Sequence, residues 1–224
     1  MKIRTLEQLS DKLAEELAWR KIELSALKGM IDLKSFSSGK NKALLRSGIT
    51  MLYANWEGFI KVSSNSYLEF VAMQNLPYNN LSHNFIALAM KDKLNQANQT
   101  NKATIYNEVA EFFLTKMAER SSIKYVNRIT TSNLSSSVFK EIVCMLGLDY
   151  SFYESKEVLI DEKLLKKRNT IAHGNYLDID EKEYDELHTQ IITIMDNFRN
   201  QIDNCASTKQ YYRQTESITS PEHL

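Results

Sequence analysis

Glycine and proline are scarce in this chain, and this scarcity constrains its fold more than any other feature of the sequence. Six glycines and two prolines occur in 224 residues, which is roughly a third of the average usage of the two residues together. Tight turns depend on these residues. Because 43% of the residues are hydrophobic and 25% are charged, as in ordinary soluble domains, we expect a globular protein built from long helices.

The glycines also stand singly along the sequence, which bears on function. Neither a Walker loop nor a dinucleotide fingerprint can be written from them, because both motifs need glycines close together. The two cysteines, Cys144 and Cys205, lie in apolar-periodic stretches and offer neither a disulfide framework nor a zinc knuckle. We expect both thiols to be small buried side chains, and we expect no cofactor and no metal ion.

The charge balance and the hydropathy narrow the partners and the compartment. Lys plus Arg and Asp plus Glu number 28 each, so no global positive field attracts nucleic acid and any RNA binding must be local. The N-terminus lacks the apolar core of a signal peptide, and no later window reaches the roughly 18 apolar residues of a transmembrane helix. We expect a cytoplasmic protein without a membrane segment.

Apolar residues recur every three or four positions along most of the chain, which predicts an all-α fold. In the first helix Arg20 interrupts the apolar stripe, and the polar run 95–102 is predicted to be a loop. Residues 1–205 are expected to form one helical domain and residues 206–224 a polar, flexible tail. The predicted helices cover about residues 5–34, 40–73, 82–94, 103–119, 161–173 and 180–205, with a short helix between Ser135 and Gly147.

Three features of these helices can be checked directly. The Ser132–Ser135 run offers N-cap side chains, and Gly147 and Gly174 are placed as C-terminal stops. Asp180 with Glu183 has the spacing of a capping box. Side chains expected to face the core are Val109, Phe112, Phe113 and Met117 in 103–119, and Tyr184, Leu187, Ile191, Met195, Phe198 and Ile202 in the last helix.

The segment 163–174 holds the strongest candidate for chemistry. On a helical projection Arg168 falls in the middle of an apolar stripe, where an unpaired guanidinium is very costly and needs an anion, a second subunit or a phosphate. His173 ends the helix beside Gly174, so its imidazole is free to turn toward the arginine. A structural explanation also exists, because cations followed by His-Gly suit a helix C-terminus without any function.

A second cluster lies in the helix 40–73. Arg46, Thr50, Tyr53 and Glu57 project along one flank of its apolar face, which makes a plausible wall of a cleft. Glu57 is the preferred anion for Arg168. Two glycines of this helix, Gly48 and Gly58, each weaken it by roughly 1 kcal/mol relative to alanine, which makes sense if another helix or a ligand approaches closely. Alternatively, the charges are surface charges and Tyr53 snorkels.

Three motifs together resemble those of the HEPN superfamily, a group of helical-bundle proteins that includes many bacterial ribonuclease toxins and phage-defence effectors. The segment Arg168–Gly174 resembles the Arg-x4-6-His signature of the superfamily. Tyr53–Phe59 and Ser132–Ser135 resemble motifs of the MAE-type and RiboL-PSP-associated branch. The resemblance implies a HEPN-like bundle of long antiparallel helices, and an endoribonuclease that acts without a metal ion as a homodimer, with a composite cleft between two subunits.

Carried over to this chain, the resemblance assigns Arg168 and His173 as the catalytic pair, supported by Asn169. Imidazole groups exchange protons near neutral pH, and a guanidinium can fork onto two phosphate oxygens. Attack by a ribose 2′-OH would leave a 2′,3′-cyclic phosphate and would require RNA rather than DNA. The residues expected to bind substrate or to support the pair are Arg46, Tyr53, Glu57, Lys167 and Tyr176.

The resemblance also implies an antitoxin or a defence-system partner protein. HEPN toxins silenced by a nucleotidyltransferase often carry Tyr two residues after the His, whereas Tyr176 stands three after His173, so silencing by modification at Tyr176 is not expected. The remaining histidines, His83, His188 and His223, are expected on helix surfaces or in the tail. Two alternatives stay open: a HEPN module that binds a nucleotide or RNA without catalysis and recruits a partner, and a structural dimerisation protein.

Overall fold

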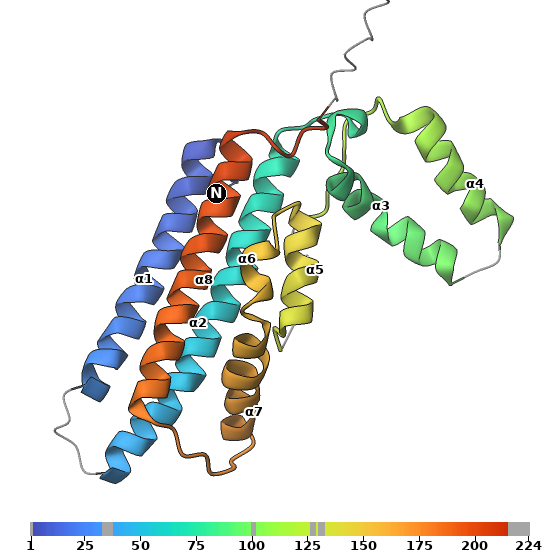
Figure 1. The fold of residues 1–224 in the computed structure, drawn as a ribbon. Coiled ribbons are helices and arrows are strands. Elements are labelled where there is room, and N and C mark those ends of the chain that lie inside the picture. The colour runs from blue at the N-terminus through green and yellow to red at the C-terminus, as the bar shows by residue number, and fades with distance from the viewer. Residues whose placement is uncertain (1, 33–37, 100–101, 126–128, 130–132, 215–224) are drawn as a thin grey trace, which may run out of the picture.

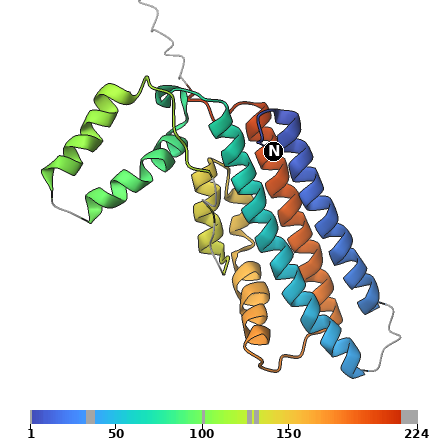
Figure 2. The ribbon, with the colours of Figure 1, turned by 180° about the vertical axis from the view of Figure 1, so that it is seen from behind.

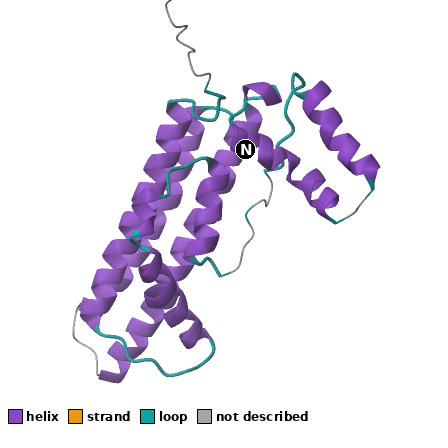
Figure 3. Ribbon diagram, turned by 45° about the vertical axis from the view of Figure 1, so that its right-hand side comes forward, coloured by secondary structure: helices purple, strands orange, loops and turns teal. Residues whose placement is uncertain are grey.

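The computed structural model describes residues 2–32, 38–99, 102–125, 129 and 133–214, and within these residues the fold is all-α, as predicted (Figure 3). A 3-10 turn (Tyr78–Asn80) and two π-helical segments (Phe112–Lys116 and Leu159–Leu165) accompany the α-helices. The α-helices are α1 (Leu6–Asp32), α2 (Ser38–Met73), α3 (His83–Asn98), α4 (Ala103–Glu111), α5 (Ser136–Leu146), α6 (Ser151–Glu154), α7 (Lys166–Ala172) and α8 (Glu181–Ser207).

Three long helices, α1, α2 and α8, lie side by side and form the body of the molecule (Figures 1 and 2). The chain runs down α1 and up α2, so these two helices are antiparallel, and α8 runs parallel to α2 (Figure 1). The shorter helices α5, α6 and α7 line the side of α2, and α3 with α4 projects from one end of the bundle (Figure 2). This is the long-helix bundle that the sequence predicts.

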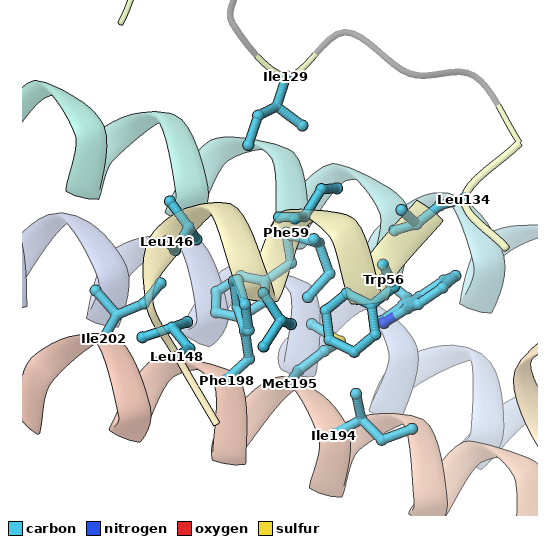
Figure 4. Packing of buried hydrophobic residues seen from close by; sticks show 14 of the residues in the cluster. Trp56, Phe59, Ile129, Leu134, Leu146, Leu148, Ile194, Met195, Phe198 and Ile202 are labelled. Carbon is cyan, nitrogen blue, oxygen red and sulfur yellow. The ribbon is translucent and has the colours of Figure 1, made fainter. Parts of the chain in front are cut away.

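Aromatic side chains join α2, α5 and α8 in the core (Figure 4). Phe139 of α5 meets the ring of Trp56 at a centroid distance of 5.9 Å and that of Phe198 at 5.6 Å, and all three rings are fully buried. Leu134 packs into the same core just before α5 begins. The inward positions predicted for the last helix are confirmed, because all of them are buried in α8: Tyr184, Leu187, Ile191, Met195, Phe198 and Ile202.

The two glycines inside α2 are places of close approach, as predicted. A Cβ on Gly48 would lie 2.6 Å from a ring carbon of Tyr184 in α8, so this glycine lets α8 pack against α2. A Cβ on Gly58 would lie 3.2 Å from Nη2 of Arg20 in α1. Neighbouring helices therefore explain both glycines.

Several helix ends follow the sequence signals. Ser135 caps α5 by accepting a hydrogen bond from the Val138 N–H at 3.3 Å, and Gly147 ends α5 at φ 71°. The predicted capping box before α8 is wrong, because the Asp180 side chain makes no capping hydrogen bond. The Glu183 carboxylate, which would complete the capping box, instead pairs with the ammonium of Lys167 at 2.5 Å.

Two expectations for the projecting α3–α4 region are wrong. Phe113 is 48% exposed, because the π-helical segment that begins at Phe112 breaks the α-helical period on which its inward placement depended. Residues 95–98 of the polar run continue α3 instead of forming a loop. Phe112 is buried as predicted, and its ring packs edge-on against Tyr78 at 4.8 Å.

Other placements also differ from the sequence-based expectation. Cys144 is exposed on α5, while Cys205 is buried as expected. His188 is buried within α8, beside the ring of Tyr184. Part of the predicted tail is packed, because Tyr211 is 4% exposed and its carbonyl accepts a hydrogen bond from the Ser82 N–H at 2.9 Å. The rest of that tail, 215–224, lies outside the described residues.

Candidate functional site

The segment that carries the Arg-His motif is built from a π-helical turn followed by α7. Leu164 in the π-helical segment is fully buried and anchors it to the core. At the other end Gly174 takes φ 78°, as predicted for a helix stop. The Gly174 N–H binds the Ile171 carbonyl at 3.0 Å, and the Asn175 N–H binds the Thr170 carbonyl at 3.1 Å. These two bonds form a Schellman motif, which fixes the backbone around His173.

Arg168 is half-buried, and neutral groups hold its guanidinium. The guanidinium carbon lies 4.6 Å from the centroid of the Tyr53 ring. Nη1 donates to the side-chain oxygen of Asn133 at 3.0 Å and to that of Asn169 at 2.7 Å. Asn133 has φ 62°, a left-handed conformation that asparagine tolerates better than most residues. The side chain of Arg168 is therefore fixed in direction, although neither amide oxygen neutralises its charge.

Tyr53 supports this arrangement from below the guanidinium. Its side chain is buried, its hydroxyl donates to Oε1 of Glu57 at 3.1 Å, and the hydroxyl oxygen accepts from the Leu134 N–H at 2.6 Å. Burial raises the pKa of Tyr53 to about 12, against the opposing effect of the Leu134 N–H, and the nearby Glu57 carboxylate adds to the rise. The phenol is therefore neutral near pH 7.

Glu57 is not the direct partner of Arg168 that the sequence suggests. Its carboxylate is occupied by the Tyr53 hydroxyl and by the Lys61 ammonium, whose Nζ lies 3.4 Å from Oε1. Tyr53 stands between the carboxylate and the guanidinium, because its hydroxyl reaches Glu57 while its ring faces Arg168. A hydroxyl and a ring thus replace the predicted ion pair.

His173 lies at the end of α7 and is exposed. It lines a pocket of about 380 Å³ with Asp161, Asn169, Thr170 and Asn175, among others. Asn169 links Arg168 to this pocket, because it lines the pocket and also accepts a hydrogen bond from Arg168. Within the described residues, no hydrogen bond joins the Arg168 guanidinium to the His173 imidazole. Five residues along an α-helix turn a side chain by about 140°, which agrees with the absence of this hydrogen bond.

Arg46 and Tyr176 form a separate cluster with Lys42. Nη2 of Arg46 donates to the Asn175 carbonyl at 3.1 Å, and its guanidinium carbon lies 5.7 Å from the centroid of the Tyr176 ring. Both residues line a second pocket, of about 640 Å³. Because Asn175 lines the His173 pocket and binds Arg46, the two pockets are neighbours.

Lys167 binds a residue that lies outside the predicted site. Its ammonium pairs with Glu183 at the start of α8, and its side chain is 18% exposed. The structure thus does not bring Lys167 to the groups around Arg168, because the adjacent helix supplies a carboxylate for it.

Two residues of this region were missed as site residues in the sequence. Asn133, an acceptor for Arg168, stands inside one of the quoted motifs, where its tolerance of a left-handed backbone was the available signal. Asp161 accepts from the Ser136 N–H at 2.7 Å and from the Ser136 hydroxyl at 2.5 Å. This carboxylate ties the segment leading into α7 to the start of α5, and no local sequence pattern indicates the pairing.

The described part of the chain contains no group of three or more His, Cys, Asp or Glu side chains arranged to hold a metal ion. None of its helices has both the length and the apolar character that crossing a bilayer requires.

The sequence matches the model of a HEPN domain family, the MAE_28990-like HEPN family, over residues 9–211. This range includes every residue of the two pockets and of the Arg168 cluster. No curated protein and no solved structure matches the chain at a significant level.

Proposed function

The chain belongs to this HEPN family, and from that premise we propose that it is an endoribonuclease of the toxin or antiviral-defence type. In this proposal it cuts RNA without a metal ion, in a composite site formed by two copies of the chain. HEPN domains are commonly ribonucleases. The observation that carries the proposal is the environment of Arg168.

The Arg168 guanidinium keeps its positive charge available for a phosphate. Its described partners are two amide oxygens and a phenol ring, all of them neutral near pH 7. A guanidinium that serves only the fold is normally paired with a carboxylate when it is partly buried. Two parallel hydrogen bonds to phosphate oxygens would supply the missing negative charge. This residue would therefore stabilise the charge that develops at phosphorus.

His173 would move the protons of the reaction. In the proposed step the imidazole removes the proton from a ribose 2′-OH, O2′ attacks the adjacent phosphorus, and the bond from phosphorus to the 5′-oxygen breaks. The departing 5′-oxygen takes up a proton, which leaves a 2′,3′-cyclic phosphate and a 5′-hydroxyl. The exposure of His173 on its pocket and the fixed turn at Gly174 suit this role.

A homodimer would explain why no hydrogen bond joins Arg168 and His173 within the described part of one chain. A two-fold axis near α7 would bring His173 of the partner subunit toward Arg168, and it would do so twice, because the contact is reciprocal. One imidazole could then accept the 2′-OH proton while the other donates to the 5′-oxygen. Asn169, which contacts Arg168 and lines the pocket, would hold the pair in register.

In this proposal the protein acts in the cytoplasm and is held in check by an antitoxin or by a defence-system partner. Its balanced charge of 28 basic and 28 acidic residues gives weak non-specific affinity for RNA. Substrate choice would then depend on local contacts at the two pockets.

The proposal is tested by incubating the purified full chain with RNA in EDTA. Cleavage should occur with the natural sequence and should fall at least ~100-fold in Arg168→Ala and in His173→Ala. Arg4→Ala and His83→Ala are matched controls, because both residues are exposed and lie outside the pockets described above, and both should cut normally. Mass spectrometry of the products should find cyclic phosphate ends. Intact RNA after incubation with the natural sequence would refute the proposal.

The second candidate function is a HEPN module that binds a nucleotide or RNA without cutting it and recruits a partner. The observation in its favour is that no hydrogen bond joins His173 and Arg168 within the described residues of one chain. RNA bound tightly and released intact, with the same result at all times and pH values, would favour this function over the ribonuclease.

A further inference from the structure

The pocket of about 640 Å³ beside the His173 loop is not used by the catalytic step above. We propose that it binds one nucleotide of the RNA chain, next to the nucleotide that carries the scissile phosphate. The base would stack on Tyr176 over an apolar floor, and the phosphate would bind Arg46. This inference rests on the proposed ribonuclease function and adds to it a subsite that selects the substrate.

The floor of the pocket is largely apolar. Side chains of Ala43, Met51 and Ile171 line it, together with Thr50. Its volume lies within the range of pockets that enclose small organic ligands, which runs from about 300 to 1,000 Å³. An apolar floor with a few polar groups at the rim suits a flat heterocycle.

Tyr176 supplies the aromatic surface of this pocket. The residue is 68% exposed, which is high for a tyrosine, yet several contacts hold it in place. The Arg46 guanidinium lies 5.7 Å from its ring centroid, and the hydroxyl accepts from Lys42 Nζ and donates to Asp178, each at 3.4 Å. An exposed ring that is already fixed can stack on a base at little cost in conformational entropy.

Two cations stand at the rim, and one of them is free to bind an anion. Lys42 pairs with the Asp178 carboxylate at 3.0 Å, and this hydrogen bond raises the pKa of the lysine. Arg46, in contrast, has the Asn175 carbonyl and the Tyr176 ring as its described partners, and both are neutral groups. The charge of Arg46 is therefore not neutralised by these partners, and the same is true of the charge of Arg168. A phosphate at Arg46 would compensate it.

The position of the pocket identifies which nucleotide would bind. Asn175 lines the His173 pocket, and its backbone carbonyl accepts a hydrogen bond from Arg46, which lines the larger pocket. Ile171 of α7 also lines the larger pocket. An RNA strand whose reacting ribose lies at His173 therefore has a neighbouring nucleotide next to Arg46 and Tyr176. The preference for certain bases at the cut would arise here.

The binding test uses calorimetry with the four nucleoside monophosphates and the full chain. Tyr176→Ala should weaken binding about tenfold. Tyr176→Phe should weaken it less, because the ring remains while its hydroxyl contacts to Lys42 and Asp178 are lost. Arg46→Gln should weaken binding of the monophosphate much more than binding of the nucleoside. Tyr106→Ala and Arg4→Gln are matched surface controls and should bind normally. Unchanged binding in both Tyr176→Ala and Arg46→Gln would overturn the inference.

The cleavage test separates this inference from the proposed function. With RNA as substrate, Tyr176→Ala should raise KM about tenfold, change kcat little and flatten the preference for the base beside the cut. If the natural sequence cuts RNA and both Tyr176→Ala and Arg46→Gln have the KM of the natural sequence, the inference is wrong and the ribonuclease proposal is retained. If no RNA is cut but nucleotide binding depends on Tyr176, the ribonuclease fails and the nucleotide pocket stands. Nucleotide binding lost in a variant that keeps its KM for RNA would overturn the assignment to the RNA chain.

Discussion

Two arginines, Arg20 and Arg168, each interrupt an apolar stripe in the sequence, yet their guanidinium groups have different partners in the structure. Arg20 is 5% exposed and forms an ion pair with Glu16, and it also donates to the Glu16 carbonyl at 2.8 Å. Its guanidinium carbon lies 4.2 Å from the Trp19 ring centroid, and its Nη2 lies against Gly58. Arg168 is half-buried and is held by amide oxygens and a phenol ring.

Both arginines occupy the same kind of position in the hydrophobic pattern, so this position does not distinguish a structural arginine from a functional one. The groups that bind the guanidinium do. A carboxylate partner compensates the charge of Arg20 within the fold, so this charge needs no ligand. Amide oxygens orient Arg168 without compensating it. The predictions below test whether the two arginines divide in this way.

The largest effect is expected for Arg20→Ala on stability. Arg20→Ala removes a buried guanidinium together with its ion pair, its hydrogen bond to the Glu16 carbonyl and its packing against Trp19, while Glu16 keeps its ion pair with Lys12. We expect a loss of about 3 kcal/mol in unfolding free energy, from the lost packing and hydrogen bonds. Arg168→Ala should cost less than about 1 kcal/mol, because amides exposed to solvent can bind water instead. Urea unfolding followed by circular dichroism measures both values. Equal losses of stability in the two variants would break the comparison.

Tyr53→Phe separates the ring beneath Arg168 from the hydroxyl that supports it. The change leaves the Leu134 N–H without its acceptor at 2.6 Å, so we expect a loss of about 1–3 kcal/mol in unfolding free energy. Cleavage should change only a few-fold, because the ring that faces the guanidinium remains. Tyr53→Leu, which lacks the ring, should reduce cleavage further. A Phe variant as inactive as the Leu variant would assign the function to the hydroxyl.

How much of this could be predicted depends on how far apart in sequence the interacting residues lie. The helices α1, α2 and α8 follow from apolar periodicity, since each turn of a helix repeats the same local rule. The stops at Gly147 and Gly174 are equally local, because a left-handed residue ends a helix by itself. The pattern failed at Phe113, where a π-helical segment shifts the period.

The environment of Arg168 could be predicted only in part. The sequence indicated that the arginine needs a partner, and it placed Tyr53 and Asn169 near it. The identity of the acceptor Asn133, 35 residues away, depends on how the segment before α5 lies against α7. Glu57 was the wrong choice because the Tyr53 hydroxyl and Lys61 already occupy its carboxylate. Such competition between partners is decided by tertiary packing and leaves no mark in a single sequence.

Asn133→Gly removes one of the two amide oxygens that direct Arg168. Glycine accepts the left-handed backbone at φ 62° without strain, so the unfolding free energy should stay within about 1 kcal/mol of the natural value. Cleavage should fall roughly tenfold, because the guanidinium loses an orienting hydrogen bond to a charged group. Asn133→Ala is the companion variant, and it should lose the same activity and some stability in addition. Full activity in the Gly variant would mean that Asn169 alone directs Arg168.

The smallest effect is an acid-dependent stability that the Arg20 region should have and the Arg168 region should not. Burial raises the pKa of Glu16, but hydrogen bonds from Lys12 and Arg20 lower it more, so its folded-state pKa lies below the ordinary value of 4.5. A carboxyl whose pKa is lowered by folding stabilises the fold above its unfolded pKa, and this contribution is lost as the pH falls through the folded value. The stability difference between the natural sequence and Glu16→Gln should therefore shrink as the pH falls below 4.5. Asn169→Ala is the matched change beside Arg168, where the direct partners are amides that do not titrate, so its stability difference should stay constant over the same range. A shrinking difference there would mean that a carboxylate compensates Arg168 after all.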